Sequence, residues 1–402
     1  GVLTYSLSDS AAGRFAIDAV SGVVTVADGR LLNHDDATEH SITIVATDAG
    51  GLASNANMTI RVLNVAPTSP VDADATSTEV PEGAATGTVL GLTASSTDPS
   101  GGQLTYSLLD DSSGRFAIDA STGLVTVANG ALLNYETATQ HEITVLVTDA
   151  SGLMSTATFT IPVVNVAPII PADQNATVNA IVEGASAGTL VGVTAQSSDP
   201  SGGLVVYSLL DNLGSRFAID AGAGVITVGS GGVLDYDQAT SHTITVVATD
   251  AAGLQSNASF TIAVLNVAPS VPVDDNPDVN AVLEGSVAGT AVGLTATSVD
   301  PSGGVLMYSL SDDAGGRFTI NANSGVVMVA DGAQLDHGTA TSHSITVVAT
   351  DAGGLTAATL FTIAVSNLAP SIATDQTHVV QDEGQPAINS GSTSSAGAST
   401  GS

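Results

Sequence analysis

The stretch LDYDQATSHTITVVATDAAGL, residues 234–254, decides the fold of this chain. Its centre alternates Thr with Ile, Val and Ala, and acidic residues stand before it at Asp235 and Asp237 and after it at Asp250. Alternation with a period of two predicts a strand that buries one face and exposes Thr on the other. The DAAGL sequence that follows is typical of a turn. We therefore expect antiparallel β-structure with carboxylates at the strand ends.

The whole pattern recurs with a period of 101 residues. The Tyr-Ser-Leu triplet begins at Tyr5, Tyr106, Tyr207 and Tyr308. A period of this length is the size of one globular domain. We predict a partial repeat over 1–67 whose start is missing, complete repeats over 68–168, 169–269 and 270–370, and, over 371–402, the start of a further repeat followed by a Ser/Gly-rich tail.

Strand signals are dense within each copy. In the third repeat they are TVNAIVEG, TLVGVTAQ, LVVYSLL, RFAID, GVITV, HTITVVATD and ASFTIAVLNV, separated by turn clusters such as SDPSGG and DAGAG. Seven short strands in about 100 residues are typical of the immunoglobulin class. The predicted fold is all-β: tandem immunoglobulin-like Greek-key β-sandwich domains in a linear array.

Composition excludes several classes of function. The formal charge is -33, with 39 Asp plus Glu against 6 basic residues, so a nucleic-acid partner is excluded because phosphate binding needs a basic face. No apolar run is long enough to insert directly into a membrane. The absence of Cys excludes Cys-based zinc sites. No catalytic motif stands out, and we expect no enzymatic activity.

Carboxylates recur at four positions in the repeat: in the first strand, in the DPSGG turn, in the stretch before the TVxxTD strand, and at the end of that strand. Each position alone is explained by turn formation, because Asp accepts backbone N–H hydrogen bonds in turns. Together they form a set of oxygen donors at strand ends in a chain without Lys. Such a set is suited to Ca²⁺, which takes six to eight oxygen ligands in flexible geometry.

The order of these segments resembles a cadherin domain of the bacterial, cadherin-like kind found in large surface adhesins. VEGASAGTLVGVTAQSSDPSGGLVVYSLL is similar to the cadherin opening, and RFAIDAGAGVITV is similar to its F-x-I-D-x-x-T-G-x-I segment. LDYDQATSHTITVVATD resembles the L-D-R-E stretch with the A-x-D strand, and TIAVLNVAP resembles the closing strand and linker. The resemblance covers nearly all of residues 1–385.

The resemblance implies Ca²⁺ between successive domains, where it would stiffen the chain into a rod. The first junction would use Asp35, Asn64, Asp98 and Asp149. The second junction would use Glu82, Glu136, Asn165, Asp199 and Asp250. The third junction would use Glu183, Asp235, Asp237, Asn266, Asp300 and Asp351.

Some residues depart from the cadherin pattern. NVAP replaces the acidic linker D-x-N-D-N-x-P, and Ser100, Ser201 and Ser302 stand where D-x-D has its second Asp. Fewer charged ligands predict fewer ions per junction, weaker affinity, or no bound ion. Asp173, Asp274 and Asp275 could compensate from beyond the linker.

Two further residue types recur once per copy. The histidines His40, His141, His242 and His343 precede the TVxxTD strand and are expected to be surface residues at a strand edge. The arginines Arg14, Arg115, Arg216 and Arg317 are expected to pair with a local carboxylate.

These features predict an extracellular or cell-surface, calcium-binding stalk segment of an adhesin whose parent protein is membrane-associated. Its partners would be calcium ions and either like repeats or cell-surface ligands. The alternative is that the repeats are spacers or carbohydrate-binding modules of a larger secreted enzyme. Scarce aromatic residues, 3% of the chain, argue against sugar stacking.

Overall fold

The computed structural model describes residues 1–99 and 101–369, which form two compact units. The first unit holds Gly1–Val267 together with the turn Asp300–Gly304, and the second holds Ala268–Val299 and the described chain from Val305 onward. The further repeat and tail expected over 371–402 lie outside the described residues. Among the described residues, no helix has the length and apolar character that a bilayer span requires.

The third repeat shows the complete sandwich. Its strands are β14 (Ala172–Asp173), β15 (Ala180–Val182), β16 (Leu190–Gln196), β17 (Val206–Asp211), β18 (Phe217–Ile219), β19 (Val225–Val228), β20 (Ser241–Thr249) and β21 (Gln255–Leu265). One sheet has the order β14-β16-β19-β18 and the other the order β15-β21-β20-β17. Strand β15 pairs parallel with β21, whereas the remaining pairs are antiparallel. The chain therefore crosses between the two sheets several times, as in immunoglobulin-like sandwiches.

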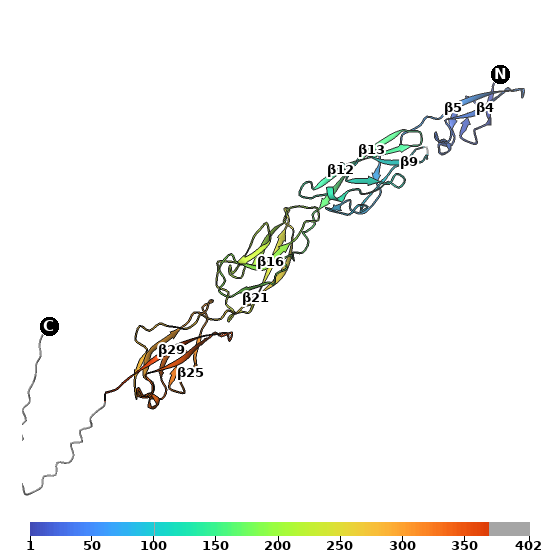
Figure 1. The fold of residues 1–402 in the computed structure, drawn as a ribbon. Coiled ribbons are helices and arrows are strands. Elements are labelled where there is room, and N and C mark those ends of the chain that lie inside the picture. Colours follow the sequence, from blue (N-terminus) through green and yellow to red (C-terminus); the bar gives the residue numbers. More distant parts are fainter. Residues whose placement is uncertain (100, 370–402) are drawn as a thin grey trace, which may run out of the picture. The chain divides into compact units, whose positions relative to one another are not determined.

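The second and fourth repeats have the same order of strands. The second contains β6 (Val71–Asp72), β7 (Val80–Pro81), β8 (Val89–Ser95), β9 (Leu104–Asp110), β10 (Phe116–Ile118), β11 (Leu124–Val127), β12 (Gln140–Asp149) and β13 (Met154–Val164). The fourth contains β22 (Val273–Asp274), β23 (Ala281–Leu283), β24 (Ala291–Thr297), β25 (Met307–Asp312), β26 (Phe318–Ile320), β27 (Val326–Val329), β28 (Ser342–Thr350) and β29 (Thr356–Ser366). Figure 1 shows β12, β13 and β9 as neighbours in one sheet, in agreement with their pairing.

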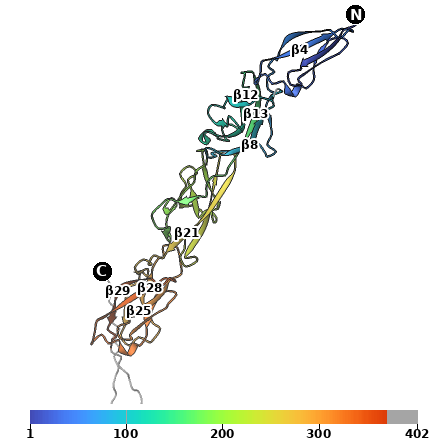
Figure 2. The same ribbon diagram turned by 90° about the vertical axis from the view of Figure 1, so that its right-hand side faces the viewer.

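The first repeat has five strands: β1 (Thr4–Asp9), β2 (Phe15–Ile17), β3 (Val24–Val26), β4 (Glu39–Thr47) and β5 (Ala53–Arg61). They form the sheets β1-β4-β5 and β2-β3. Strand β4 lies in the N-terminal part of the ribbon (Figure 2), and it pairs antiparallel with β5. The described helices are single 3₁₀ turns, namely η1 (Gly29–Leu31), η2 (Gly130–Leu132) and η3 (Gly332–Gln334).

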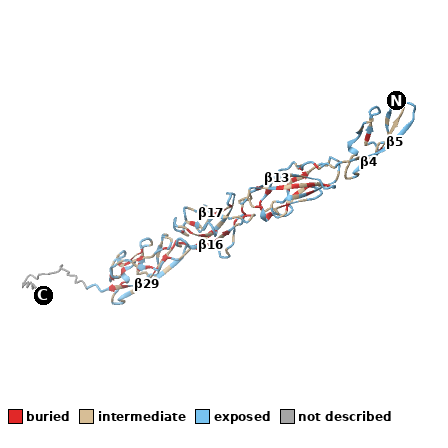
Figure 3. Ribbon diagram, turned by 90° about the horizontal axis from the view of Figure 1, so that it is seen from above, coloured by how far each residue is buried: buried red, intermediate tan, exposed pale blue. Residues whose placement is uncertain are grey.

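Each complete repeat encloses its own apolar core between its two sheets. In the third repeat Ile244, Val246 and Ile262 are fully buried, whereas Thr243 and Thr261 face outward and their hydroxyls are 3.1 Å apart. Figure 3 shows the buried residues along β13 alternating with less buried ones. The alternation expected from the sequence is therefore confirmed.

The all-β class and the tandem sandwiches are also confirmed. All seven strands expected in the third repeat are present, and the sequence analysis missed only the two-residue strand β14. Strand β14 is set by a side chain rather than by a hydrophobic pattern. Oδ1 of Asp173 accepts hydrogen bonds from the N–H groups of Asn175 and Thr194. The arrangement of the sandwiches in a line stays a prediction.

Candidate metal centre

The Glu that directly follows the second short strand of each repeat is a buried anchor. Glu82 is 2% exposed; its Oε2 accepts from the N–H of Tyr135 at 3.0 Å and its Oε1 from the N–H of Val166 at 2.9 Å. Glu183 repeats both bonds with Tyr236 and Val267. One carboxylate thus joins the end of a strand, the loop before the TVxxTD strand and the linker, and its charge is compensated by two peptide dipoles.

In the fourth repeat the equivalent hydrogen bonds lower the pKa of the Glu side chain. Glu284 accepts from the N–H groups of Leu368 and His337. The bond from Leu368, followed by that from His337, holds the pKa of Glu284 below its usual value. Hydrogen bonds to the charged form favour that form, so this carboxylate stays ionised at neutral pH.

The Asp of the DPSGG turn is also buried, with Asp199 and Asp300 each 4% exposed. Asp199 Oδ1 accepts from the N–H and the hydroxyl of Ser201 at 2.8 and 2.5 Å and from the N–H of Gly203 at 3.2 Å. Its Oδ2 is inaccessible to solvent and has no hydrogen-bond partner among the described residues. One oxygen of Asp199 therefore holds the turn, and the other remains available as a ligand.

Asp300 repeats this geometry in the next turn, where Ser302 and Gly304 are the donors. Burial acts to raise the pKa of Asp300, but the hydrogen bonds from Ser302 and Gly304 outweigh burial and lower it. The turn carboxylate is thus held in its charged form.

Three carboxylates meet at the second junction. Ligand oxygens of Glu82, Glu136 and Asp199 lie within 4.8 Å of one another. Both oxygens of Glu136 are inaccessible to solvent and accept no hydrogen bond within the described chain. Burial, and then the charges of Glu82, Asp199 and Asp250, raise the pKa of Glu136. This is the response expected of like charges gathered away from water.

Asn165 and Asp250 complete the predicted set at this junction. Asn165 Nδ2 donates to Asp250 Oδ2 at 3.2 Å, while Asp250 Oδ1 accepts from three N–H groups of its own turn. Asn165 Oδ1 is buried and accepts no hydrogen bond from the described residues. The structure thus brings the predicted residues of the second junction together as one triad and one adjoining pair.

The first junction has a related arrangement with more internal hydrogen bonds. Asn64 Nδ2 donates to Asp149 Oδ2 at 2.9 Å, and the hydroxyl of Ser151 donates to Asp35 Oδ1. Asp35 and Asp98 flank Gly102, where a Cβ atom would collide with Asp35 Oδ2 and lie 3.0 Å from Asp98 Oδ2. All four predicted residues therefore lie near a neighbouring repeat, although Ser151 uses one oxygen of Asp35.

At the third junction the structure brings together only part of the predicted set. A Cβ atom on Gly304 would lie 2.7 Å from Asp237 Oδ2 and 3.3 Å from Cγ of Asp300. Asp235 instead closes its own turn, accepting from the N–H of Asp237 at 2.8 Å and from Gln238 Nε2 at 2.7 Å.

The remaining residues of that set belong to different units. Asn266 lies in the first unit. Asp351 lies in the second unit, where its Oδ1 accepts from the N–H of Leu355 at 2.8 Å. The ligand roles of Asp235, Asn266 and Asp351 stay predictions.

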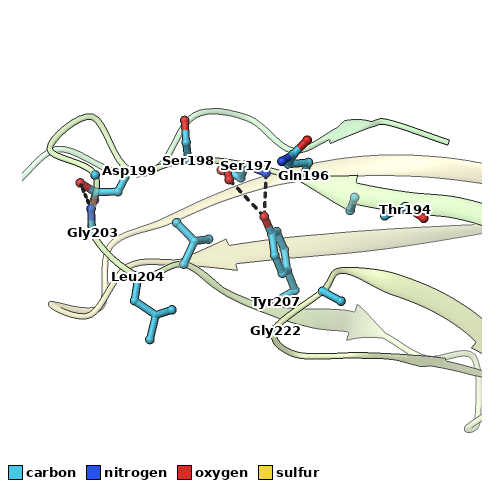
Figure 4. A pocket seen from close by; sticks show the side chains of 13 residues that line it. Thr194, Gln196, Ser197, Ser198, Asp199, Gly203, Leu204, Tyr207 and Gly222 are labelled. Atoms are coloured by element: carbon cyan, nitrogen blue, oxygen red, sulfur yellow. Dashed lines mark hydrogen bonds between the residues drawn. The ribbon is translucent and has the colours of Figure 1, made fainter.

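The turn that carries Asp199 is fixed by a tyrosine. The Tyr207 hydroxyl accepts from the N–H of Ser197 at 2.7 Å and donates to the carbonyl of Ser197 at 3.2 Å. Figure 4 shows this pair beside a pocket of about 540 Å³ that extends to Asp199. Tyr106 and Tyr308 hold Ser96 and Ser298 in the same way, so the position of the turn is set from within its own sandwich.

The expectation for the histidines is wrong in part. They are half-buried, and each ring packs edge-on against the Phe of the RF pair, as for His242 and Phe217 with centroids 5.8 Å apart. Nε2 of His141 is buried without a hydrogen-bond partner in the part of the chain described. Burial, and then the charge of Arg115, lower the pKa of His141.

The expected pairing of the arginines with a carboxylate is also wrong. Arg115 donates Nε–H to the carbonyl of Leu132 at 2.9 Å and Nη1–H to the carbonyl of Ser112 at 2.7 Å. Ser112 has a φ of 58°, which turns its carbonyl toward the guanidinium. The arginine therefore fastens two loops of its own repeat through neutral acceptors.

Asp173 and Asp274 each use Oδ1 within their own repeat, and their compensation for the shortened linker stays a prediction. Asp274 Oδ1 accepts from the N–H groups of Asn276 and Thr295 within the fourth repeat, and Asp173 forms the equivalent bonds in the third. These carboxylates fasten a loop to a strand. No side-chain bond is described for Asp275, whose backbone N–H pairs with Thr295.

Comparison with known proteins accounts for this arrangement of strands and acids. The family model for the cadherin domain matches residues 76–164 and 178–265. These segments are cadherin domains in tandem. The matched segments contain the three carboxylates that converge at the second junction, Glu82, Glu136 and Asp199.

Alignments with protocadherins extend along most of this chain. Protocadherin Fat 1 of Homo sapiens is 27% identical over 358 residues, covering 85% of this chain and 8% of that protein. Protocadherin-16 of Rattus norvegicus is 31% identical over 341 residues, covering 79% and 10%. The chain thus spans about a tenth or less of these cadherin relatives.

Among solved structures, mouse cadherin-23 EC22-24 is 27% identical, covers 76% of this chain and 100% of that chain, and has a TM-score of 0.34. The proteins compared do not bear on a bacterial origin, which stays a prediction.

Proposed function

We propose that this chain is an extracellular segment of an adhesion protein, in which Ca²⁺ bound between cadherin repeats neutralises converging carboxylates and stiffens the chain. The observation that carries this proposal is the triad Glu82, Glu136 and Asp199, whose oxygens lie within 4.8 Å. We also propose the repeat boundaries predicted from the sequence as its folding units.

The donor set fits a hard cation. Glu136 Oε1 and Oε2, Asp199 Oδ2 and Asn165 Oδ1 are buried oxygens that accept no hydrogen bond from the residues described. Ca²⁺ takes carboxylate and amide oxygens in flexible geometry, and water supplies the remaining positions. A divalent charge would reverse the repulsion that raises the pKa of Glu136.

The three carboxylates at the second junction have different roles in the proposed cation site. Glu82 holds the linker and the loop in place through two backbone hydrogen bonds. Asp199 offers its second oxygen from a turn fixed by the first. Glu136, with both oxygens available, supplies the ligand that gains most from a cation. We infer an affinity in the extracellular range, with a Kd on the order of 10⁻⁴–10⁻³ M.

Isothermal titration calorimetry with Ca²⁺ tests the proposal. The chain is expected to bind Ca²⁺, and Glu136→Gln is expected to remove the heat of the second junction. Glu142→Gln is the matched control, because Glu142 is an exposed carboxylate in the same repeat, at the outer face of β12. Absence of Ca²⁺ binding, or equal losses in both variants, would overturn the proposal.

A further inference from the structure

The glycine that follows the first-strand Glu lies against the backbone of the next repeat. Gly83 has a φ of 61°, and a Cβ atom there would lie 2.5 Å from the carbonyl oxygen of Pro200 and 2.8 Å from its carbon. Gly184 faces the carbonyl oxygen of Pro301 in the same way. The DPSGG turn therefore rests directly on a glycine backbone, and a side chain at that position would displace it.

A neutral hydrogen bond joins the same two repeats. Asn134 Nδ2 donates to the hydroxyl oxygen of Ser201 at 3.0 Å, and that hydroxyl donates to Asp199 Oδ1. Asn134 Oδ1 accepts from the N–H of Thr137 at 2.8 Å, which fixes the orientation of the amide. Ser201, which stands in place of a second Asp, thus serves as a link between repeats.

The second glycine of the turn allows the carboxylates to approach. A Cβ atom on Gly203 would lie 3.2 Å from Cγ of Asp199 and 3.4 Å from Glu136 Oε2. The two acids that the cation is proposed to bridge therefore lie close to this position, and a Cβ atom there would make a tight contact with Asp199. This contact brings the charges together, whereas the contacts of Gly83 and Asn134 hold the backbones in place.

We propose that Gly83, Asn134, Pro200 and Ser201 form a clasp that keeps the second and third repeats in register without a bound cation. The clasp uses two main-chain groups and two neutral side chains, so its contacts persist when Ca²⁺ is withdrawn. The clasp brings the turn onto Gly83, and the cation then stiffens this junction further by relieving the repulsion around Glu136. The role of the cation at Glu136 rests on the proposed function, whereas the clasp itself does not.

The fourth repeat contains a matched control for the glycine. Gly285 has a φ of 65°, close to the 61° of Gly83, but no described atom lies within 4 Å of its Cβ position. Ala at Gly83 and at Gly285 therefore introduces the same backbone strain. Only the substitution at Gly83 also breaks the clasp.

Double electron–electron resonance measures the register of the repeats. The chain has no Cys, so Thr158→Cys and Thr261→Cys place one spin label on the exposed face of β13 and one on that of β21. With chelator present, we expect a single narrow distance distribution for the labelled chain, which Ca²⁺ should narrow further. Gly83→Ala should lose the narrow peak, whereas Gly285→Ala should keep it. Asn134→Ala, which carries no backbone strain, should also broaden the distribution.

Two results would overturn the clasp. One is a broad distribution in the unsubstituted labelled chain under chelator, and the other is a narrow distribution in both Gly83→Ala and Asn134→Ala. Calorimetry separates this result from the proposed function, because a chain that binds no Ca²⁺ could still show the narrow peak. With Ca²⁺ present, the misplaced ligands of Gly83→Ala should weaken the second junction about tenfold in Kd.

Discussion

The backbone N–H of Val166 donates to Glu82 Oε1 at 2.9 Å, joining two residues that are 84 positions apart. Glu183 with Val267, and Glu284 with Leu368, repeat the bond in the next two repeats. The segment that leaves each of these repeats is therefore fastened to the Glu that directly follows the repeat's second strand, which is β7, β15 or β23. This attachment does not depend on a cation.

Replacing Glu82 tests this attachment. Glu82→Gln keeps one acceptor but directs an amide N–H group toward the second backbone donor, which leaves a buried donor unsatisfied. We expect a loss of about 1–3 kcal/mol in the free energy of unfolding under chelator. Urea denaturation measures it, and Glu79→Gln, at an exposed position three residues away, should have little effect. If Glu82→Gln were as stable as the unsubstituted chain, the bonds of Glu82 to the backbone would contribute nothing to stability.

Glu136 should behave in the opposite way. Its carboxylate is buried among like charges that raise its pKa, so Glu136→Gln should raise the melting temperature in chelator. In Ca²⁺ the same variant should gain less from the ion than the unsubstituted chain, for which saturation at about 100 times Kd contributes about 2.7 kcal/mol. Differential scanning calorimetry in both buffers measures the two effects. A lower melting temperature of the variant in chelator would contradict the repulsion inferred here.

The His–Phe pairs predict an acid sensitivity. Burial, followed by a neighbouring arginine, lowers the pKa of His141, His242 and His343 below 6.5. Below about pH 6.5 the unfolded chain takes up protons that the folded chain excludes, so this contribution to stability is lost as pH falls through the lowered folded-state pKa. Thermal melts under chelator at pH 7.5 and 5.5 should show a smaller pH effect in the triple His→Gln variant. If the melting temperature changed between pH 7.5 and 5.5 as much in the variant as in the unsubstituted chain, the mechanism would be disproved.

Tyr207 should contribute to the stability of the turn that carries Asp199. Tyr207→Phe removes the acceptor of the Ser197 N–H and should cost about 1–3 kcal/mol in the free energy of unfolding, because a half-buried donor loses its partner. Chemical denaturation of the third repeat reports this loss. A near-neutral result would mean that water replaces the hydroxyl.

The third repeat is expected to fold as an independent domain. Residues 169–269 contain a complete buried cluster centred on Phe217 and Ile244, so the excised repeat should unfold in one cooperative transition under chelator. Phe217→Ala should remove about 3–5 kcal/mol of its stability. Circular dichroism during urea denaturation measures both. A non-cooperative transition would argue against the proposed boundaries.

Local sequence patterns determined the sandwiches. The 101-residue period and the alternation around Ile244 predicted the strands and their buried faces, because side-chain direction in a strand follows from position alone. The recurring acids marked the junctions for the same reason, since turns and strand ends have local signals.

Only the tertiary structure decided what the marked residues contact. The family resemblance placed Glu136 and Asp199 at one junction, but the sequence does not show that Asp235 closes its own turn. Nor does it show that Arg115 donates to backbone carbonyls or that the His141 ring packs against Phe116. It also does not show that Gly83 receives the carbonyl of Pro200. These contacts join segments far apart in the chain, and they depend on how finished sandwiches close their loops on one another. No local propensity encodes that geometry.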